Sequence, residues 1–356
     1  MMFRYLLFLL GVLLALPMAL LTVLSFNLPV TLSGIGYMLA CLLVVSGLIM
    51  APWGGRYASL LIVSSLVVII VVASARLIQA ARNRPSNLRI VTLPGEKESR
   101  WINHIIDEQD SLIFGEALFH RVGGDSAGEH EGITGALESV YSTIRGTQGT
   151  FASPVLSTYL GLQRPAAFDT VIVEPETNHH PEAAVIFLHG YMGNVTAQCW
   201  AIAQAAQKIG AVTVCPSADW TGQWWSAQGQ AILQATFRYL RAQGREKFYV
   251  GGFSNGGFGI SRMVSTLAEE DEIRGLFFIN GVSEAASIRE TGIPVLIIQG
   301  TQDERVPATQ VRAIAGTLGD RATYVELQGD HFMIIKQPEP VQQTLQAWLE
   351  GLETAR

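Results

Sequence analysis

The chain has 356 residues, of which 49% are hydrophobic and only 15% are charged, and its net charge is −6. This composition is too apolar for an ordinary soluble protein, and the absence of a long basic run argues against a nucleic-acid partner. The length predicts two domains, or one domain with an addition. Cys41, Cys199 and Cys215 form no C-x-x-C pair, so we expect three buried, small apolar side chains and no disulfide-stapled fold.

The chain begins with three apolar runs that contain no acidic or basic side chain: Tyr5–Phe26, Ile35–Met50 with its neighbours, and Tyr57–Ala75. Runs of this length can span a bilayer. A signal peptide is the alternative for the first run, but two further apolar runs follow it. Transport or proteolysis inside a membrane usually requires polar groups at depth. We therefore predict that residues 1–82 are a three-span transmembrane anchor.

Arginines near the ends of the spans suggest an orientation. Arg76, Arg82, Arg84 and Arg89 follow the third run closely, whereas Arg4 and Arg56 would lie on the opposite side of the membrane. Because cytoplasmic loops are enriched in Lys and Arg, this count favours a multi-pass protein with its large C-terminal part in the cytoplasm. The amino group of the N-terminus favours the reverse.

Residues 83–165 have the least regular pattern. Leu88–Leu93 is compatible with a strand, Trp101–Asp110 with the start of a helix, and Ile133–Ile144 has a weak helical period. Gly123–Gly128 and Gly146–Gly149 are loop signals. We interpret this segment as a linker and an irregular extension, which either covers the following domain as a lid or supports it structurally.

Residues 166–356 alternate between strand and helix patterns. Strands are predicted at Thr170–Val173, Ala184–Leu188, Val212–Cys215, Phe248–Val250, Leu276–Ile279, Val295–Gln299 and Thr323–Leu327. Helices are predicted at Thr196–Ile209, Gly229–Arg241, Phe258–Ala268, Ala308–Leu318 and Pro340–Leu352. This alternation predicts an α/β domain with a mostly parallel sheet and helices on both faces. In such sheets, functional side chains gather at the carboxyl ends of the strands.

The sequence Gly252-Phe253-Ser254-Asn255-Gly256 joins a predicted strand to a predicted helix. Strand, tight turn, serine and helix together make a nucleophile elbow, in which flanking glycines leave room for a strained, exposed serine. Three other strand ends carry His189-Gly190-Tyr191-Met192-Gly193-Asn194, Gly300-Thr301-Gln302-Asp303, and Gly329-Asp330-His331-Phe332. With these four motifs in this order, residues 168–352 resemble the α/β-hydrolase family, most closely its carboxylesterase and lysophospholipase-like members.

The resemblance implies a catalytic triad in the chain order Ser254, Asp303, His331. His331 would act as the base that activates the serine hydroxyl, and Asp303 would orient the imidazole. Glu304 and Asp330 are alternative acids. His189 is expected to pack and hydrogen-bond, and the adjacent His179 and His180 lack the spacing of metal ligands. We expect neither a metal nor a cofactor.

The resemblance also implies an oxyanion hole made by the backbone N–H groups of Asn255 and Tyr191, with Met192 as the alternative second donor. Trp220, Trp224 and Trp225 follow the strand that ends at Cys215, and we expect them either to line an acyl or aromatic pocket or to pack under the loop. Only a short connection separates Ile279 from Pro294, which leaves no space for a cap domain and predicts an open site.

We therefore predict a membrane-anchored serine hydrolase that cleaves hydrophobic acyl esters through an acyl-enzyme. Its substrate would be a small-molecule or lipid ester. One alternative is a peptidase that resembles the prolyl-oligopeptidase-like hydrolases. Another is a catalytically inactive hydrolase fold that serves as a membrane-tethered interaction module.

Overall fold

The structure is a computed structural model of the whole chain, and it describes residues 2–25, 28–82, 86–121, 123–124, 126–176, 182–267 and 272–354. The chain divides into two compact units. Unit 1 consists of Met1–Asn83 and His104–His130, and unit 2 consists of Arg84–Asn103 and Glu131–Arg356. The predicted extension at 83–165 is therefore divided between the units, because its middle third packs with the apolar N-terminal helices.

Unit 1 contains three long helices where the apolar runs were predicted: α1 (Met2–Ser25), α2 (Leu32–Met50) and α3 (Gly55–Ala81). All three are long and apolar enough to cross a membrane. Thr31 caps the start of α2 with its side chain, which accepts a hydrogen bond from the N–H of Gly34. Between α3 and α2, the buried Ser65 hydroxyl donates to the carbonyl of Ala40 at 2.8 Å.

Polar contacts hold a further segment of unit 1 to these helices. This segment includes α4 (Glu108–Arg121) and α5 (Ala127–His130). The guanidinium of Arg76 on α3 pairs with Asp107 at 3.0 Å and donates from Nε to the carbonyl of His104. Asp110 accepts hydrogen bonds from the N–H and the hydroxyl of Thr31 at 2.8 and 2.5 Å. The charge of Arg76 is therefore buried and paired.

Unit 2 is built on one sheet with the strand order β2-β1-β3-β5-β4-β6-β7-β8-β9. In this order, the strands from β5 through β9 are parallel, while β1 and β3 pair antiparallel at one side. Their bounds are β1 (Leu88–Leu93), β2 (Lys97–Glu98), β3 (Phe168–Val173), β4 (Ala183–Leu188), β5 (Val212–Pro216), β6 (Lys247–Phe253), β7 (Ile273–Ile279), β8 (Val295–Gly300) and β9 (Ala322–Leu327). β1 and β2, which lie in the predicted extension, therefore belong to the sheet.

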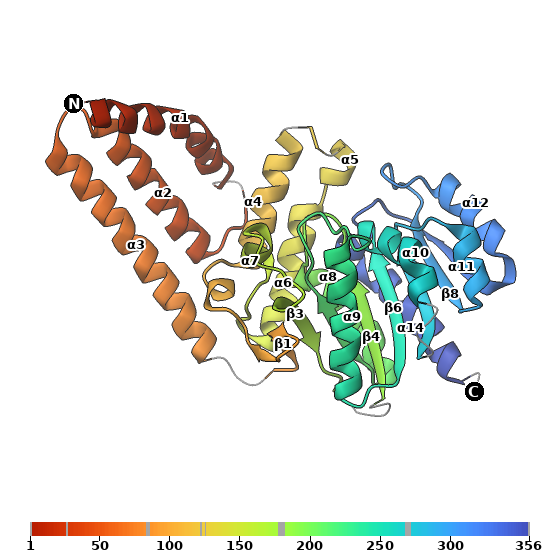
Figure 1. Cartoon of the computed structure of the whole chain (residues 1–356). Helices are drawn as coiled ribbons and strands as arrows, with labels where there is room; N and C mark the ends of the chain where they lie inside the picture. The colour runs from red at the N-terminus through yellow and green to blue at the C-terminus, as the bar shows by residue number, and fades with distance from the viewer. Residues whose placement is uncertain are drawn as a thin grey trace. The chain divides into compact units, whose positions relative to one another are not determined.

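Helices lie on both faces of the sheet (Figure 1). Those on one face contact each other in the series α6, α8, α13 and α14, and those on the other in the series α10, α11 and α12, with α9 beside β1 and β5. Their bounds are α6 (Ile133–Gln148), α7 (Val155–Tyr159), α8 (Thr196–Ala206), α9 (Ala227–Ala242), α10 (Asn255–Leu267), α11 (Ala285–Thr291), α12 (Ala308–Leu318), α13 (Met333–Lys336) and α14 (Pro338–Thr354). The predicted mostly parallel α/β architecture is thus confirmed. The central strands are buried on both faces, as expected for a parallel sheet that helices cover on each side.

The prediction for the cysteines is confirmed for the burial of Cys199 and Cys215 and wrong for their pairing and for Cys41. Cys199 of α8 and Cys215 of β5 form a disulfide, with Cα atoms 6.1 Å apart. They are 16 residues apart, and only the packing of α8 against β5 brings them together. Cys41 is free and lies exposed on α2, where we expected it to be buried.

Candidate active site

A strained turn presents Ser254 between β6 and α10. Ser254 has a φ of 51°, which is in the left-handed region that residues with a side chain seldom adopt. A Cβ at Gly252 would lie 2.3 Å from the backbone of Gly256, and one at Gly256 would lie 1.9 Å from the carbonyl oxygen of Leu188. The two glycines are therefore sterically required, as expected for a nucleophile elbow.

Three side chains from separate strand ends form a continuous hydrogen-bonded chain. The Nε2 of His331 lies 3.0 Å from the Oγ of Ser254, and its Nδ1 lies 2.8 Å from the Oδ2 of Asp303. His331 and Asp303 are buried, whereas Ser254 is partly exposed. The structure therefore brings together the three residues that the sequence singled out. This geometry suits transfer of the serine proton to the imidazole.

Asp303 is held in place by donors on both carboxylate oxygens. Its Oδ1 accepts the N–H groups of Arg305 and Val306 at 2.9 and 2.8 Å. Gln299 donates from Nε2 to Oδ2 at 3.3 Å. Neither alternative acid takes this place, since Glu304 is exposed and Asp330 pairs with Lys336 at 2.6 Å.

Asn280 joins the turns that carry these residues, and the sequence analysis did not identify it. Its side-chain Nδ2 donates to the carbonyls of Asp330 and His331 at 3.0 and 2.9 Å, and its Oδ1 accepts the N–H of Gly300 at 2.8 Å. Asn280 is fully buried with a φ of 48°, a conformation that asparagine tolerates better than most residues. Its place at the end of β7 was the only available signal, because it belongs to no motif.

His189 has the packing role that we expected. Its Nε2 accepts the N–H of Ala218 at 3.1 Å, and its Nδ1 lies 2.8 Å from the carbonyl of Gly190. Burial lowers the pKa of His189 to about 4, against the smaller raising effects of the Gly190 hydrogen bond and the Asp219 charge. The ring is therefore neutral at physiological pH, and it holds the turn after β4 against the loop after β5.

Backbone groups near Ser254 define where an oxyanion hole would form. Asn255 is the first residue of α10, so its N–H has no partner within the helix. Gly190 passes so close to Ser254 that a Cβ at Gly190 would lie 3.0 Å from the Cβ of Ser254, which brings the following residue, Tyr191, to the same edge. The N–H of Met192 is already donated to the carbonyl of Trp220 at 2.8 Å. This contact leaves Tyr191 as the better second donor.

The three predicted tryptophans occupy different environments. Trp224 is fully buried, and its Nε1 donates to the carbonyl of His189 at 2.9 Å. It belongs to the core, so the alternative of packing under the loop holds for Trp224 and the assignment as a pocket wall does not. Trp225 is half-buried and lies beneath the guanidinium of Arg262, 4.1 Å from the ring centroid. Trp220 alone of the three is exposed, and its loop is tied to the site because Asn255 donates from Nδ2 to the carbonyl of Thr221 at 2.8 Å.

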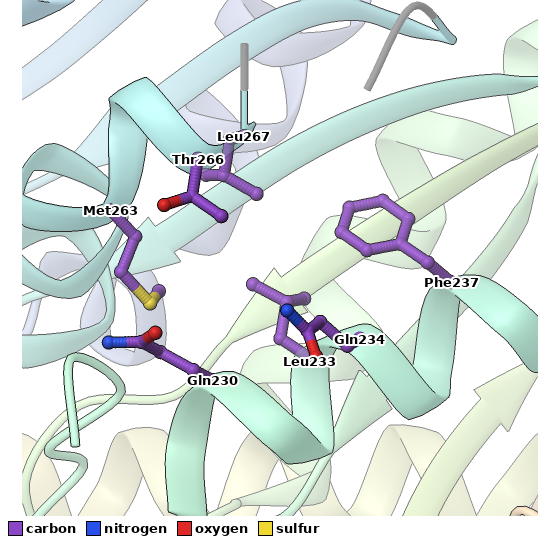
Figure 2. A pocket seen from close by; sticks show the side chains of 7 residues that line it. All are labelled: Gln230, Leu233, Gln234, Phe237, Met263, Thr266 and Leu267. Carbon is purple, nitrogen blue, oxygen red and sulfur yellow. The ribbon is translucent and has the colours of Figure 1, made fainter. Parts of the chain in front are cut away.

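Two other hollows lie away from this site. A cavity of about 20 Å³ between α9 and α10 is lined by Gln230, Leu233, Gln234, Phe237, Met263, Thr266 and Leu267 (Figure 2). It is too small for an ester substrate. A larger hollow of about 540 Å³ includes Pro294 and Val295 at the amino end of β8, opposite to the end that leads to Asp303. Among the described residues, no group of three His, Cys, Asp or Glu side chains is placed to hold a metal. His179 and His180 lie outside the described residues.

Comparison with known proteins supports the fold. A sequence profile described as the alpha/beta hydrolase family matches residues 233–334, which include Ser254, Asp303 and His331. No curated protein matches this chain. The chain has the α/β-hydrolase fold.

Solved structures similar to this chain include an esterase, Est1E, from Butyrivibrio proteoclasticus, with 16% identity and a TM-score of 0.43 over 53% of this chain and 95% of Est1E. A serine hydrolase without a lid from Xanthomonas campestris has 20% identity and a TM-score of 0.41, over 52% of this chain and 89% of that one. An alpha-beta serine hydrolase homologue from Coxiella burnetii has 18% identity and a TM-score of 0.41, over 51% and 92%.

Proposed function

We propose that this protein is a membrane-anchored serine hydrolase that cleaves carboxylic esters through an acyl-enzyme intermediate. The observation that carries the proposal is the hydrogen-bonded chain from Ser254 through His331 to Asp303. It begins at a serine held in a strained turn, where the hydroxyl is accessible. These features are the ones that nucleophilic catalysis by serine requires.

The proposed reaction has two halves. His331 takes the proton of Ser254 as the Oγ attacks the ester carbonyl, and the N–H groups of Asn255 and Tyr191 stabilise the oxyanion. The tetrahedral intermediate then collapses, the C–O bond of the ester breaks, and His331 gives its proton to the leaving alcohol. In the second half, His331 takes a proton from water as the water attacks the acyl-enzyme. The carboxylic acid leaves, and His331 returns the proton to Ser254. Asp303 holds the imidazole in the required tautomer throughout.

Labelling of the membrane-embedded protein with a fluorophosphonate tests this proposal. We expect wild type to be labelled at Ser254, with the site established by mapping of the modified peptide, and Ser254→Ala to remain unlabelled. Loss of the nucleophile should lower kcat for a methyl ester by roughly 10⁶-fold. Ester turnover that persists in Ser254→Ala, or labelling of another serine in wild type, would refute the assignment.

Membrane anchoring by α1, α2 and α3 is part of the proposal, and two features bear on the orientation. Arg76 pairs with Asp107 and Arg89 pairs with Glu96 and Glu174 inside the folded units, so neither is a free cation beside the bilayer. The remaining arginines are balanced, with Arg82 and Arg84 on one side of the membrane and Arg4 and Arg56 on the other. With this count, the arginines favour neither orientation.

The Cys199–Cys215 disulfide supports the opposite orientation. Disulfides persist in oxidising compartments and are rare in the cytoplasm. We therefore propose that unit 2 lies on the non-cytoplasmic side of the membrane.

Thiol blocking in intact cells tests the orientation, with Cys41→Ser used as background to remove the free thiol. The Cys41→Ser protein is then denatured and treated with a maleimide-linked polymer. We expect no polymer to be added before the disulfide is reduced, and two polymers to be added, at Cys199 and Cys215, after reduction. Cys199→Ser in the same background provides the reference, because its single remaining thiol should react without reduction. Two free thiols in the Cys41→Ser protein would place unit 2 in a reducing compartment and overturn the proposal.

A further inference from the structure

Exposed aromatic rings gather at one place on unit 2. Among its described residues, the exposed large apolar side chains are Trp101, Tyr159, Leu160, Leu162, Tyr191 and Trp220. All except Trp101 come from the end of α7 and from the two loops that follow β4 and β5. Tyr159 and Tyr191 are each 46% exposed, and Trp220 is 40% exposed. Exposed apolar side chains that cluster in this way commonly mark a binding site.

The ring of Trp220 contacts those of Tyr159 and Tyr191 in an ordered arrangement. Tyr159 and Trp220 lie with their centroids 6.3 Å apart and their planes at 19°, whereas Tyr191 stands at 67° to Trp220 with a centroid distance of 5.1 Å. The hydroxyl of Tyr159 donates to the sulfur of Met192 at 3.6 Å. We call Tyr159, Tyr191 and Trp220 the aromatic platform. Its offset-parallel and edge-to-face contacts are the arrangements that aromatic rings prefer, and a further ring can extend them.

The aromatic platform is fixed beside Ser254 by backbone contacts. Its Trp220 loop accepts hydrogen bonds from the N–H of Met192 and from the side chain of Asn255, the residue after the serine. A Cβ at Gly222 would lie 2.6 Å from the carbonyl oxygen of Gly190, so the two loops are in direct contact. Gly190 in turn lies against Ser254. A substrate group on the platform would therefore lie next to the ester carbonyl under attack.

We propose that the aromatic platform binds an aromatic ring in the ester substrate, so that the preferred substrates of this site are aryl-bearing esters. This inference rests on the proposed serine-hydrolase function and narrows its substrate class. A ring carried by the acyl group and a ring carried by the alcohol present the same surface to the platform. The experiment distinguishes the two.

The test compares esters that differ in one group, with product acid followed by titration. Methyl 3-phenylpropanoate carries the ring in the acyl half, and 3-phenylpropyl acetate carries it in the alcohol half. Methyl 3-cyclohexylpropanoate and 3-cyclohexylpropyl acetate have nearly the same volumes without an aromatic face, and methyl acetate has no ring. We expect one of the two phenyl esters to have a kcat/KM at least severalfold above that of its matched cyclohexyl ester, since ring pairing adds to the effect of area alone.

Variants identify the platform as the source of this preference. In Trp220→Ala, the ratio of kcat/KM for the preferred phenyl ester to that for methyl acetate should fall about tenfold, as expected for loss of a favourable ring pair and its buried area. Trp220→Phe should restore part of the ratio, and Tyr159→Ala should lower it less. Trp101→Ala is the matched control, because Trp101 is an exposed tryptophan of the same unit outside the platform, and its ratio should equal that of wild type.

Two outcomes would overturn the inference. An unchanged ratio in Trp220→Ala and Tyr159→Ala would show that the platform does not bind the substrate ring. Equal rates for the phenyl and cyclohexyl esters in wild type would show that the site selects apolar volume and not aromaticity. Failure of the proposed function itself is distinct, since wild type would then cleave none of these esters and would not be labelled by fluorophosphonate.

Discussion

Unit 1 exposes leucine, isoleucine and valine side chains along α1 and α3, whereas unit 2 exposes few large apolar side chains and gathers most of them beside Ser254. In unit 1, the exposed residues cover whole helices that are long enough to cross a bilayer, so their exposure suits contact with lipid. In unit 2, a dense core surrounds the sheet, and the exposed rings other than Trp101 lie in two loops and at the end of α7. Exposed apolar side chains therefore have a different role in each unit, and that role depends on the structure around them.

Buried polar side chains also have different roles in the two units. In unit 1, the buried Arg76–Asp107 pair and the Thr31–Asp110 contacts hold a segment to the apolar helices. In unit 2, buried polar groups at the strand ends are arranged around Ser254 and His331. Substitutions in unit 1 should therefore affect structure, and substitutions around Ser254 in unit 2 should affect chemistry.

After loss of the nucleophile itself, the largest effect is expected for Asp303→Asn. The amide would favour the wrong tautomer of His331, and kcat should fall by roughly 10⁴-fold with little change in the thermal midpoint. Glu304→Gln is the control, because Glu304 is exposed next to Asp303, and its kcat should match that of wild type. Similar losses in the two variants would contradict the assignment of Asp303.

Asp107→Asn in unit 1 should lower stability without changing the reactivity of Ser254. Removal of the carboxylate leaves the Arg76 guanidinium buried and without its ion-pair partner, which typically costs about 3–5 kcal/mol. The thermal midpoint of unit 1 should fall, while fluorophosphonate labelling of the folded protein keeps its rate. Glu326→Gln, which breaks an exposed pair with Arg312, should leave the midpoint nearly unchanged. A midpoint as high in Asp107→Asn as in wild type would show that the buried pair contributes nothing.

Acid should destabilise unit 2 through His189. Burial lowers its pKa to about 4 from 6.5, so between these values the unfolded chain binds a proton that the folded chain does not. Stability therefore falls as the pH drops from 6.5 towards 4, by about 3 kcal/mol from this group. In His189→Gln, the thermal midpoint should depend less on pH across this window. An identical pH dependence in variant and wild type would show that His189 is not a buried neutral ring.

Asn280→Asp tests whether one side chain holds the turns around the site. A carboxylate of the same shape cannot donate to the carbonyls of Asp330 and His331, and the resulting shift of His331 should slow fluorophosphonate labelling about 10²-fold. The final extent of labelling should remain complete, because a slower reaction, unlike unfolding, leaves every molecule competent. Asn103→Asp, at another buried asparagine of unit 2, should not alter the labelling rate. Incomplete labelling at the wild-type rate would assign Asn280 a role in folding only.

Local patterns in the sequence were sufficient for most strands and helices of residues 168–352 and for the residues at the elbow. α12 has the predicted bounds, and β6 extends the predicted strand up to Phe253. Period and glycine placement encode such features directly. The short α11 and α13 were not predicted, since they have only seven and four residues and little periodicity.

Features that depend on contacts between distant segments could not be predicted from the sequence. The partners of Asn280 lie 20 to 51 residues away, and no motif indicates them. The disulfide depends on the packing of a helix on a strand. Trp224 and Trp220 belong to one loop, yet one is buried against His189 and the other is exposed. Composition alone cannot distinguish such neighbours, because burial is decided by the rest of the fold.

The path of the chain between the units has a practical consequence. The chain leaves unit 1 near Asn83, returns to it at His104 and leaves it again after His130, so three covalent crossings join the units. A single protease cut near residue 83 would still leave residues 104–130 embedded between two pieces of unit 2. The piece that contains Ser254 would then carry α4 with Asp110 parted from Thr31. Separation of unit 2 from α1, α2 and α3 would therefore require excision of 104–130 as well.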